Sequence, residues 1–346
     1  MNYELFRIFA HVMTENPYIK QFPDLMAGKT VLYVHGFASS GQSGTVTRLR
    51  TVMPQARVVA PDLPIHPQEA VDLLHHICET EHPDLIIGTS MGGMYTEQLR
   101  GFDRICVNPA LEMGETMRAH GMTGTQQFQN PRLDGIQEFY VDKALIKEYR
   151  DVSERRFHGL TPDDERRVYG LFGDKDDVVD TFGMFSDHYA QATHFHGEHR
   201  MDDKSFMHSV LPVIRWIDDR QEGRQRPIIY IGIESLSPSP LQNGTEPKPL
   251  SSCQKAIRLL IEHYQVYFVA EEETTTQAWL TEHIGIPAWR HLIVTWRRDL
   301  LYGDYLIMKP AAKSADNMLA TVLEYGSDTF KTWDAIIDYF EKLGGQ

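Results

Sequence analysis

The sequence predicts an α/β protein with two domains, each built around a mainly parallel sheet. Short apolar runs typical of buried strands alternate with helical patterns, as in parallel sheets that helices cover on both faces. One such run breaks into a Gly-x-Ser-x-Gly motif and then continues as a helix. After a charged segment at residues 218–226 the alternation begins again, which predicts domains at 1–222 and 227–346.

The composition favours a globular protein without an anionic partner. The 346 residues are 42% hydrophobic and 10% aromatic, which supports packed cores. The formal charge of -14 argues against nucleic acid and against an anionic membrane surface. No stretch approaches the roughly 18 apolar residues of a membrane span, and residues 1–10 lack a signal-peptide pattern. We therefore expect a cytoplasmic protein, and the sequence leaves its oligomeric state open.

Neither the cysteines nor the histidines indicate a metal site. The three cysteines, Cys78, Cys106 and Cys253, are widely spaced and form no Cys-x-x-Cys pair, so buried reduced thiols are expected. His75 and His76 lie on a helix predicted at 67–80, where a solvated face accounts for them better than metal binding does. We expect no metal and no cofactor.

The chain begins with a predicted outer helix before Gly28 and then a buried strand at 29–34. That strand runs into His35-Gly36-Phe37. In hydrolases with a Gly-x-Ser-x-Gly elbow, two backbone amides form the oxyanion hole. The loop after this strand supplies one of them, and the residue after the nucleophile supplies the other. Those residues are Phe37 and Met91 here. His35 precedes the nucleophile in chain order, so we expect it to brace the loop rather than act as the base.

The motif Gly88-Thr89-Ser90-Met91-Gly92 lies between an apolar strand and a helix. Such a turn holds Ser90 in a strained conformation that makes its hydroxyl protrude. Glycine is needed on both sides because a side chain there would collide with the neighbouring strand and helix. The helix that follows directs its N-terminal amides toward the Ser90 hydroxyl, where a developing oxyanion would be stabilised.

The remaining elements of the first domain follow the same alternation up to residue 110. A helix is predicted from Thr45 and strands are predicted at 57–60 and 104–107. From about 111 to 167 the alternation stops, and the segment is polar, charged and helix-prone. It lies after the elbow and before the candidate acid, where hydrolases of this type insert a lid, so we expect a lid that carries substrate selectivity.

A late strand at 167–172 leads into a loop with three aspartates. The Gly-x-x-Asp spacing selects Asp176 as the acid of a catalytic triad, with Asp174 and Asp177 as alternatives. The base must lie on the loop after the next strand, and His199 fits this place. His208 is the alternative, although a helix predicted at 203–220 contains it.

The first domain resembles the YqiA-type esterases, a branch of the α/β-hydrolase superfamily, over about residues 29–218. The motifs that carry this resemblance are His35-Gly36-Phe37-Ala38-Ser39-Ser40, Asp62-Leu63-Pro64, Gly88-Thr89-Ser90-Met91-Gly92-Gly93, Val107-Asn108-Pro109-Ala110 and Gly197-Glu198-His199. The resemblance implies hydrolysis of short acyl esters or thioesters. The chain departs from that family by continuing for more than a hundred residues beyond the base helix.

The second domain is predicted to be a smaller Rossmann-like α/β layer. Its expected elements are strands at 227–234, 265–269, near 292 and near 306, with helices at 251–263 and from 333. It is similar to the haloacid dehalogenase-like fold, in particular to the 5'(3')-deoxyribonucleotidases. The residues that bear this likeness are 267–270, 290–295, 303–307, 325–327 and 333–334.

That likeness implies phosphatase residues which this chain lacks. The two aspartates expected after the first strand are Gly232 and Glu234, and the phosphate-binding Ser or Thr is Ala270. The magnesium carboxylates are replaced by Met308 and Lys309. We therefore expect a phosphatase-like domain without catalytic activity.

The leading hypothesis is a serine hydrolase that acts on a small acyl ester or thioester through Ser90, His199 and Asp176, with an acyl-enzyme intermediate. The alternative is a non-catalytic interaction or regulatory protein that retains two folds. A phosphatase is disfavoured by the lost aspartates.

Overall fold

The computed structural model describes residues 24–241, 247–310 and 320–344. The chain forms two compact units, and the boundary between them lies between Asp218 and Asp219. This boundary falls at the start of the charged segment 218–226, after which the alternation of strands and helices begins again in the sequence. The helix expected before Gly28 lies mostly outside the described residues.

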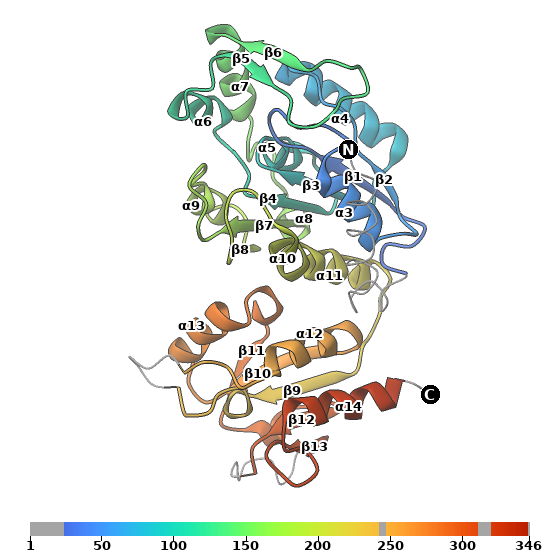
Figure 1. The fold of residues 1–346 in the computed structure, drawn as a ribbon, viewed down its shortest axis with the longest axis vertical. Coiled ribbons are helices and arrows are strands. Elements are labelled where there is room, and N and C mark those ends of the chain that lie inside the picture. Colours follow the sequence, from blue (N-terminus) through green and yellow to red (C-terminus); the bar gives the residue numbers. More distant parts are fainter. Residues whose placement is uncertain (1–23, 242–246, 311–319, 345–346) are drawn as a thin grey trace. The chain divides into compact units, whose positions relative to one another are not determined.

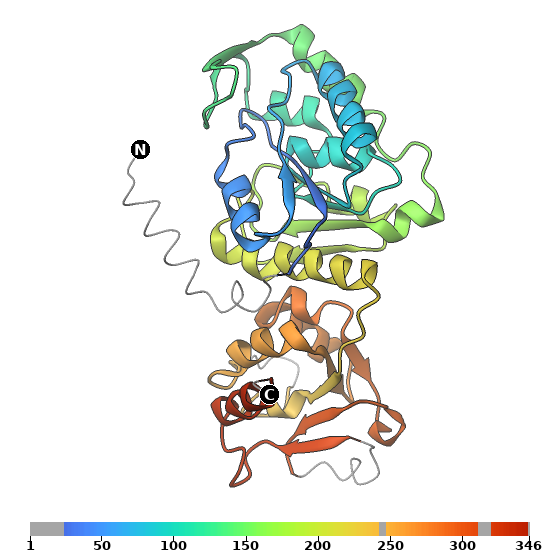
Figure 2. The ribbon, with the colours of Figure 1, turned by 90° about the vertical axis from the view of Figure 1, so that its right-hand side faces the viewer.

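Unit 1 contains a six-stranded parallel sheet in the order β2-β1-β3-β4-β7-β8. The strands are β1 (Thr30–Val34), β2 (Arg57–Val59), β3 (Leu85–Thr89), β4 (Arg104–Val107), β7 (Val168–Gly173) and β8 (Ala192–Phe195). Adjacent residues of a strand point to opposite faces, yet Val31 and Leu32 are both fully buried. The sheet is therefore covered on both faces, and helices flank it in Figures 1 and 2.

The helices α3 (Gly44–Val52), α4 (Pro67–Glu81), α5 (Met91–Gln98) and α9 (Phe182–Ser186) connect strands of this sheet, and α10 (Asp203–Ser205) and α11 (Leu211–Gln221) follow its last strand. A π-helical turn, Phe206–Val210, joins α10 to α11, whereas the sequence predicted one continuous helix there. All strands of this sheet run parallel, so their carboxyl ends lie at the same end of the sheet. The loops after β1, β3, β7 and β8 consequently meet at the carboxyl ends of the strands.

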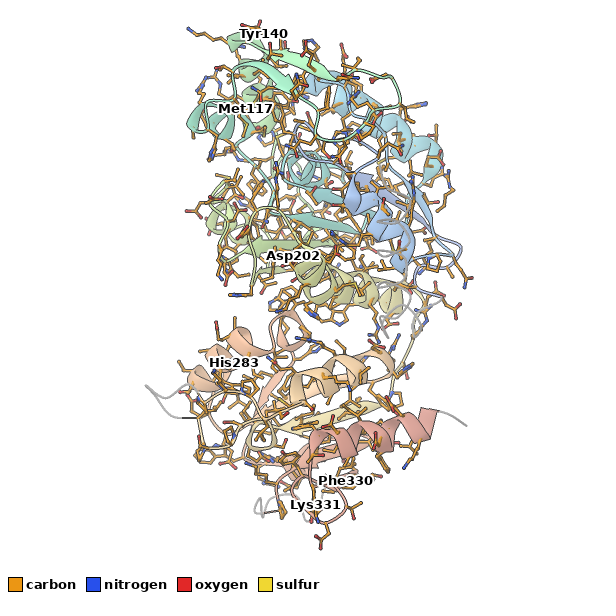
Figure 3. The ribbon with its side chains drawn as sticks, viewed as in Figure 1. Met117, Tyr140, Asp202, His283, Phe330 and Lys331 are labelled. Carbon is orange, nitrogen blue, oxygen red and sulfur yellow. The ribbon has the colours of Figure 1, made fainter. Side chains whose placement is uncertain are left out.

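The segment between β4 and β7 is an insertion, as expected, but it is not wholly helical. It contains α6 (Met113–Ala119), the antiparallel hairpin of β5 (Gly124–Gln127) and β6 (Glu138–Val141), α7 (Lys143–Ser153) and α8 (Pro162–Arg167). The hairpin escaped sequence analysis because its strands have four residues each and ten residues separate them. Figure 3 shows Met117 on α6 and Tyr140 on the hairpin.

Unit 2 contains a five-stranded parallel sheet in the order β11-β10-β9-β12-β13. Its strands are β9 (Ile228–Gly232), β10 (Gln265–Ala270), β11 (Leu292–Val294), β12 (Tyr305–Met308) and β13 (Thr321–Glu324), and its α-helices are α12 (Cys253–His263), α13 (Thr274–His283) and α14 (Trp333–Gly344). The direction of winding reverses between β9 and β12, which is the arrangement of a doubly wound α/β layer. The prediction of two α/β layers is confirmed.

Two further findings bear on the expectations from composition. The three cysteines are buried and form no disulfide. Within the described ranges, no helix combines the length and the apolar character needed to cross a membrane.

Candidate active site

Ser90 lies at the sharp turn between β3 and α5. Its backbone has φ 54° and ψ -121°, a conformation that few non-glycine residues adopt. A Cβ atom on Gly88 would lie 2.2 Å from Thr96 Oγ1 of α5, and one on Gly92 would lie 2.0 Å from the carbonyl oxygen of Val34. The expected strain at Ser90 and the need for both glycines are thus present.

Three of the residues predicted for a triad lie in one hydrogen-bonded chain. His199 Nε2 lies 2.9 Å from Ser90 Oγ, and His199 Nδ1 lies 2.8 Å from Asp176 Oδ2. The hydrogen on Nδ1 is donated to the carboxylate, which leaves Nε2 to accept the hydroxyl hydrogen. The His199 and Asp176 side chains are 14% and 5% exposed, so the hydrogen bond between them is largely shielded from water.

The environment of Asp176 favours its charged form. Its Oδ1 atom accepts hydrogen bonds from the amides of Val178 (2.8 Å) and Val179 (3.0 Å). Burial alone would raise the pKa of the Asp176 carboxyl, but the hydrogen bonds from His199 and from these amides lower the pKa below its ordinary value. The carboxylate can therefore accept from an imidazolium without taking its proton.

The alternative acids and the alternative base are placed elsewhere. Asp174 binds His196 Nδ1 at 2.8 Å and the amide of Gly197 at 2.9 Å, while Asp177 is exposed. His208 lies in the π-helical turn rather than on the loop after β8. Of the residues weighed in the sequence, Asp176 and His199 are those that the fold brings to Ser90.

The loop after β1 passes directly against the nucleophile. A Cβ atom on Gly36 would lie 3.4 Å from Ser90 Cβ. Met91 is the first residue of α5, so its amide has no acceptor within the helix. Among the described residues, no hydrogen bond takes up the amide of Phe37. Both amides proposed for an oxyanion hole are thus available to a ligand.

His35 is held in one tautomer by its backbone neighbours. Its Nδ1 atom donates to the carbonyl of Gly36 at 2.8 Å, and its Nε2 atom accepts from the amide of Leu63 at 3.0 Å. Burial is the largest effect on this ring and lowers the pKa of His35 to about 4. His35 braces the loop, as the sequence analysis expects.

Asn108 is a residue whose contribution sequence reasoning missed. It is buried at the end of β4, and its side-chain nitrogen donates to the carbonyls of Glu198 and His199. The signal in the sequence was an Asn-Pro pair directly after a buried strand. Asparagine tolerates the left-handed backbone that such a turn requires.

The histidines weighed as metal ligands do not form part of a metal-binding cluster. His75 and His76 are exposed on α4, and the described part of the chain contains no group of three or more His, Cys, Asp or Glu side chains arranged to hold a metal.

In unit 2, Glu234 follows β9 and forms a two-point ion pair with Arg298, at 2.8 and 3.0 Å.

Two comparisons of the sequence with known proteins found similarity to parts of this chain. A model of the family described as "Uncharacterised protein family (UPF0227)" matches residues 30–203. A curated relative, the "Putative 5'(3')-deoxyribonucleotidase" of Vibrio phage KVP40, is 22% identical over 99 residues, which are 27% of this chain. The chain spans 58% of the length of that relative.

The chain is also similar to solved structures, of which three are an esterase domain, a thioesterase domain and a lactonase. The "Esterase domain from Rhodothermus marinus protein" is 18% identical, with 54% of this chain and 86% of that chain covered and a TM-score of 0.37. The "Thioesterase Domain From Curacin Biosynthetic Pathway" is 15% identical, with 55% and 90% covered and a TM-score of 0.33. The "N-acyl homoserine lactonase AidH" is 13% identical, with 58% and 92% covered and a TM-score of 0.36. Identities and TM-scores this low carry no conclusion about activity. The family model, in contrast, spans half of the chain and includes the elbow, the acid loop and the base loop, and the chain belongs to the uncharacterised protein family UPF0227.

Proposed function

We propose that unit 1 is a serine hydrolase that cleaves small carboxylic esters or thioesters. The observation that carries this proposal is the hydrogen-bonded chain from Ser90 through His199 to Asp176, with the nucleophile on a strained elbow. A serine hydroxyl, an imidazole and a carboxylate hydrogen-bonded in this order are the parts that acyl transfer needs. The family match and the resemblance to YqiA-type esterases fall on the same segment of the chain.

In the proposed reaction, Ser90 Oγ attacks the acyl carbon while its proton passes to His199 Nε2. The carbonyl oxygen becomes an oxyanion that the amides of Phe37 and Met91 stabilise. The carbon to oxygen or carbon to sulfur bond then breaks, and His199 returns the proton to the leaving alcohol or thiol. A water molecule, deprotonated by His199, attacks the acyl-enzyme and releases the acid and free Ser90.

The first test is Ser90→Ala in the full chain. We expect turnover of a graded panel of p-nitrophenyl esters and acyl thioesters to fall by at least about 1,000-fold, because the acyl-enzyme cannot form. A fluorophosphonate probe should label the parent protein at Ser90 and leave the variant unlabelled. Unchanged turnover in the variant would reject the proposal and favour a non-catalytic role. In the parent protein, the dependence of turnover on acyl chain length would define the preferred substrate.

We further propose that unit 2 is a haloacid dehalogenase-like domain without phosphatase activity. Gly232 and Glu234 occupy the places of the two aspartates, and phosphoryl transfer to an aspartate is chemically unavailable without a nucleophile. The Glu234 carboxylate is engaged by Arg298, whose side chain is 4% exposed. Phosphate release from nucleotides with magnesium, measured with malachite green, should not exceed the background of heat-denatured protein. Release above that background would contradict this proposal.

A cytoplasmic location is also proposed. Three buried cysteines without a disulfide are typical of proteins in reducing compartments.

A further inference from the structure

The turn after β4 holds the backbone of the nucleophile from both sides. The amide of Ser90 donates to the carbonyl of Val107 at 2.9 Å, and the amide of Ala110 donates to the carbonyl of Ser90 at 3.0 Å. The turn is itself anchored, because Thr181 Oγ1 donates to the carbonyl of Pro109 at 2.7 Å. The elbow is therefore fixed to the segment 107–110 as well as to its own strand and helix.

Within that turn, the Asn108 side chain reaches the loops of the other two triad residues. Its Nδ2 atom donates to the carbonyls of Glu198 (3.1 Å) and His199 (3.0 Å) on the base loop. Its Oδ1 atom accepts from the amide of Gly173 at 2.7 Å, where the acid loop begins. The amide of Asp176 in turn donates to the carbonyl of Gly173 at 3.2 Å. One carboxamide thus joins the base loop to the start of the acid loop, while the backbone of the same turn holds the elbow.

Asparagine suits this position for two physical reasons. The backbone of residue 108 has φ 44°, and asparagine adopts the left-handed region more readily than most residues with a side chain. A carboxamide also presents two donors and an acceptor in one plane, and here it meets two carbonyls and one amide. The residue is 1% exposed, so water cannot replace these partners.

We propose that Asn108 is a positioning residue that sets the place of His199 and Asp176 relative to Ser90. The inference rests on the proposed hydrolase function and goes beyond it, because Asn108 touches no reacting atom. It acts on the main chain of the base loop and of the acid loop at once. Without the Asn108 carboxamide, the base loop and the acid loop lose these hydrogen bonds, so the imidazole and the carboxylate are no longer held in place. All three triad side chains remain present.

Two variants of the full chain test this role. Asn108→Gly accepts the same backbone angle but removes the carboxamide, whereas Asn108→Asp keeps the shape and replaces the donor by an acceptor. We expect both to lower kcat and the rate of fluorophosphonate labelling of Ser90, with a loss of about 100-fold in the glycine variant and little change in KM. The activity of Asn108→Asp relative to the parent should rise as the pH falls, because a protonated carboxyl regains a donor for one carbonyl.

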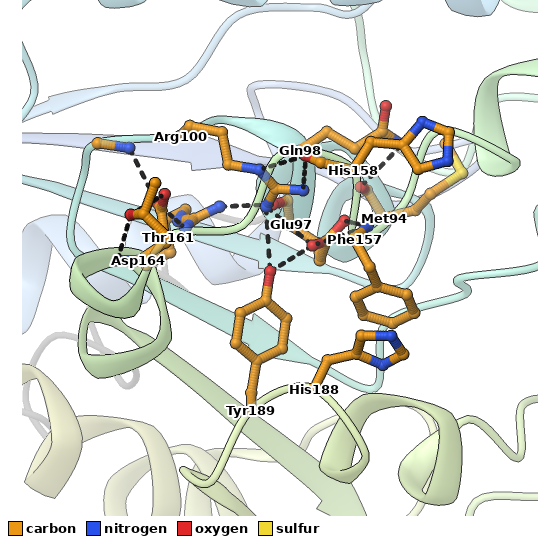
Figure 4. A network of polar contacts seen from close by, with 12 residues as sticks. Met94, Glu97, Gln98, Arg100, Phe157, His158, Thr161, Asp164, His188 and Tyr189 are labelled. Atoms are coloured by element: carbon orange, nitrogen blue, oxygen red, sulfur yellow. Dashed lines mark hydrogen bonds and ion pairs between the residues drawn. The ribbon is translucent and has the colours of Figure 1, made fainter.

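A matched control separates positioning from general loosening. Tyr189→Phe removes a buried hydroxyl that donates to Glu97, within a network at the amino-terminal edge of the same sheet (Figure 4). This network includes Arg104 at the start of β4, whereas Asn108 follows the end of that strand. We expect Tyr189→Phe to lower the melting temperature without changing the labelling rate of Ser90.

The outcomes distinguish this inference from the proposed function. Labelling at the parent rate in Asn108→Gly, or an equal loss in Tyr189→Phe, overturns the positioning role while the hydrolase assignment stands. If the glycine variant does not fold, the pH dependence of Asn108→Asp decides, and a constant ratio to the parent overturns the role. Retained turnover in Ser90→Ala removes the hydrolase function and the positioning role with it.

Discussion

At the scale of single residues, His35 lies directly after β1 and orients one amide of the proposed oxyanion hole. The carbonyl of Gly36 and the amide of Phe37 belong to one planar trans peptide, so they point in opposite directions. By donating to that carbonyl, His35 fixes the direction of the Phe37 amide. The Leu63 amide occupies the second ring nitrogen, which leaves His35 no part in proton transfer.

A pH prediction follows from the burial of His35, whose pKa is lowered from 6.5 to about 4. The unfolded chain binds a proton on this ring below pH 6.5, whereas the folded chain does so only below about pH 4. Stability is therefore lost as the pH falls from 6.5 to 4, by about 3 kcal/mol from this group. Urea unfolding over this range should show a flatter pH dependence in His35→Gln. The exposed His75→Gln is the control, and equal slopes in both variants would contradict the argument.

A second prediction concerns the carboxylate behind His199. Asp176→Asn keeps the size of the side chain but removes the acceptor that holds the hydrogen on Nδ1. Turnover should fall by about 10⁴-fold, the scale known for this change in the serine protease triad, while the melting temperature changes little. Asp174→Asn, two residues earlier in the same loop, should keep most activity because Asp174 contacts His196 and Gly197 instead of His199. Comparable losses of turnover in the two variants would contradict the assignment of the acid role to Asp176 rather than to Asp174.

At the scale of elements, the elbow depends on how closely α5 approaches β1. Gly92→Ala would place a methyl group 2.0 Å from the Val34 carbonyl and 2.6 Å from the His35 carbonyl. Because those atoms are backbone, relief requires moving the helix or the strand, and we expect a loss of about 1–3 kcal/mol. Gly44→Ala in α3 meets no atom within 4 Å and should be neutral or stabilising. Chemical denaturation compares the two, and equal stabilities would argue against the close approach.

The hairpin of the insertion has an inner and an outer side. Phe139 is 8% exposed, and the centroid of its ring lies 5.3 Å from the centroid of the Phe37 ring. The adjacent Tyr140 is 67% exposed. The hairpin therefore packs on the residue whose amide is proposed to hold the oxyanion.

Phe139→Ala should cost about 3 kcal/mol of stability and alter the preference for acyl chain length, because it removes the ring that contacts Phe37. Tyr140→Ala should change both by little. The ester panel and thermal unfolding measure the two effects. An unchanged chain-length profile in Phe139→Ala would separate the insertion from substrate selection.

At the scale of the whole molecule, each unit has its own hydrophobic core. The cluster around Leu32, Ile86 and Tyr95 contains residues of unit 1 alone. The cluster around Ile229, Phe268 and Trp333 contains residues of unit 2 alone. Each core is built between one sheet and the helices of the same unit, so each unit has the contacts that an independent domain requires.

A chain ending at Gly223 should therefore fold and keep the esterase activity of the full protein. The cut must follow Gln221, because α11 extends across the boundary at Asp218. We expect kcat/KM within about twofold of the full chain and one unfolding transition instead of two. An aggregated or inactive fragment would show that unit 1 depends on unit 2.

Features that depend on local pattern and on chain order could be predicted from the sequence. Alternating strand and helix periods predicted two parallel sheets, and Gly-x-Ser-x-Gly marked the elbow, because its glycines and strained serine are properties of a five-residue turn. The order serine, acid, histidine narrowed the partners to Asp174, Asp176 or Asp177 and to His199 or His208. Only the folded chain shows which carboxylate meets which imidazole, that the insertion contains a hairpin, and that the Asn108 side chain joins the acid loop to the base loop. The contacts of His199 and Asn108 link residues 23 to 109 positions apart. A local pattern carries no information on hydrogen bonds that form only when the ends of several strands are brought together.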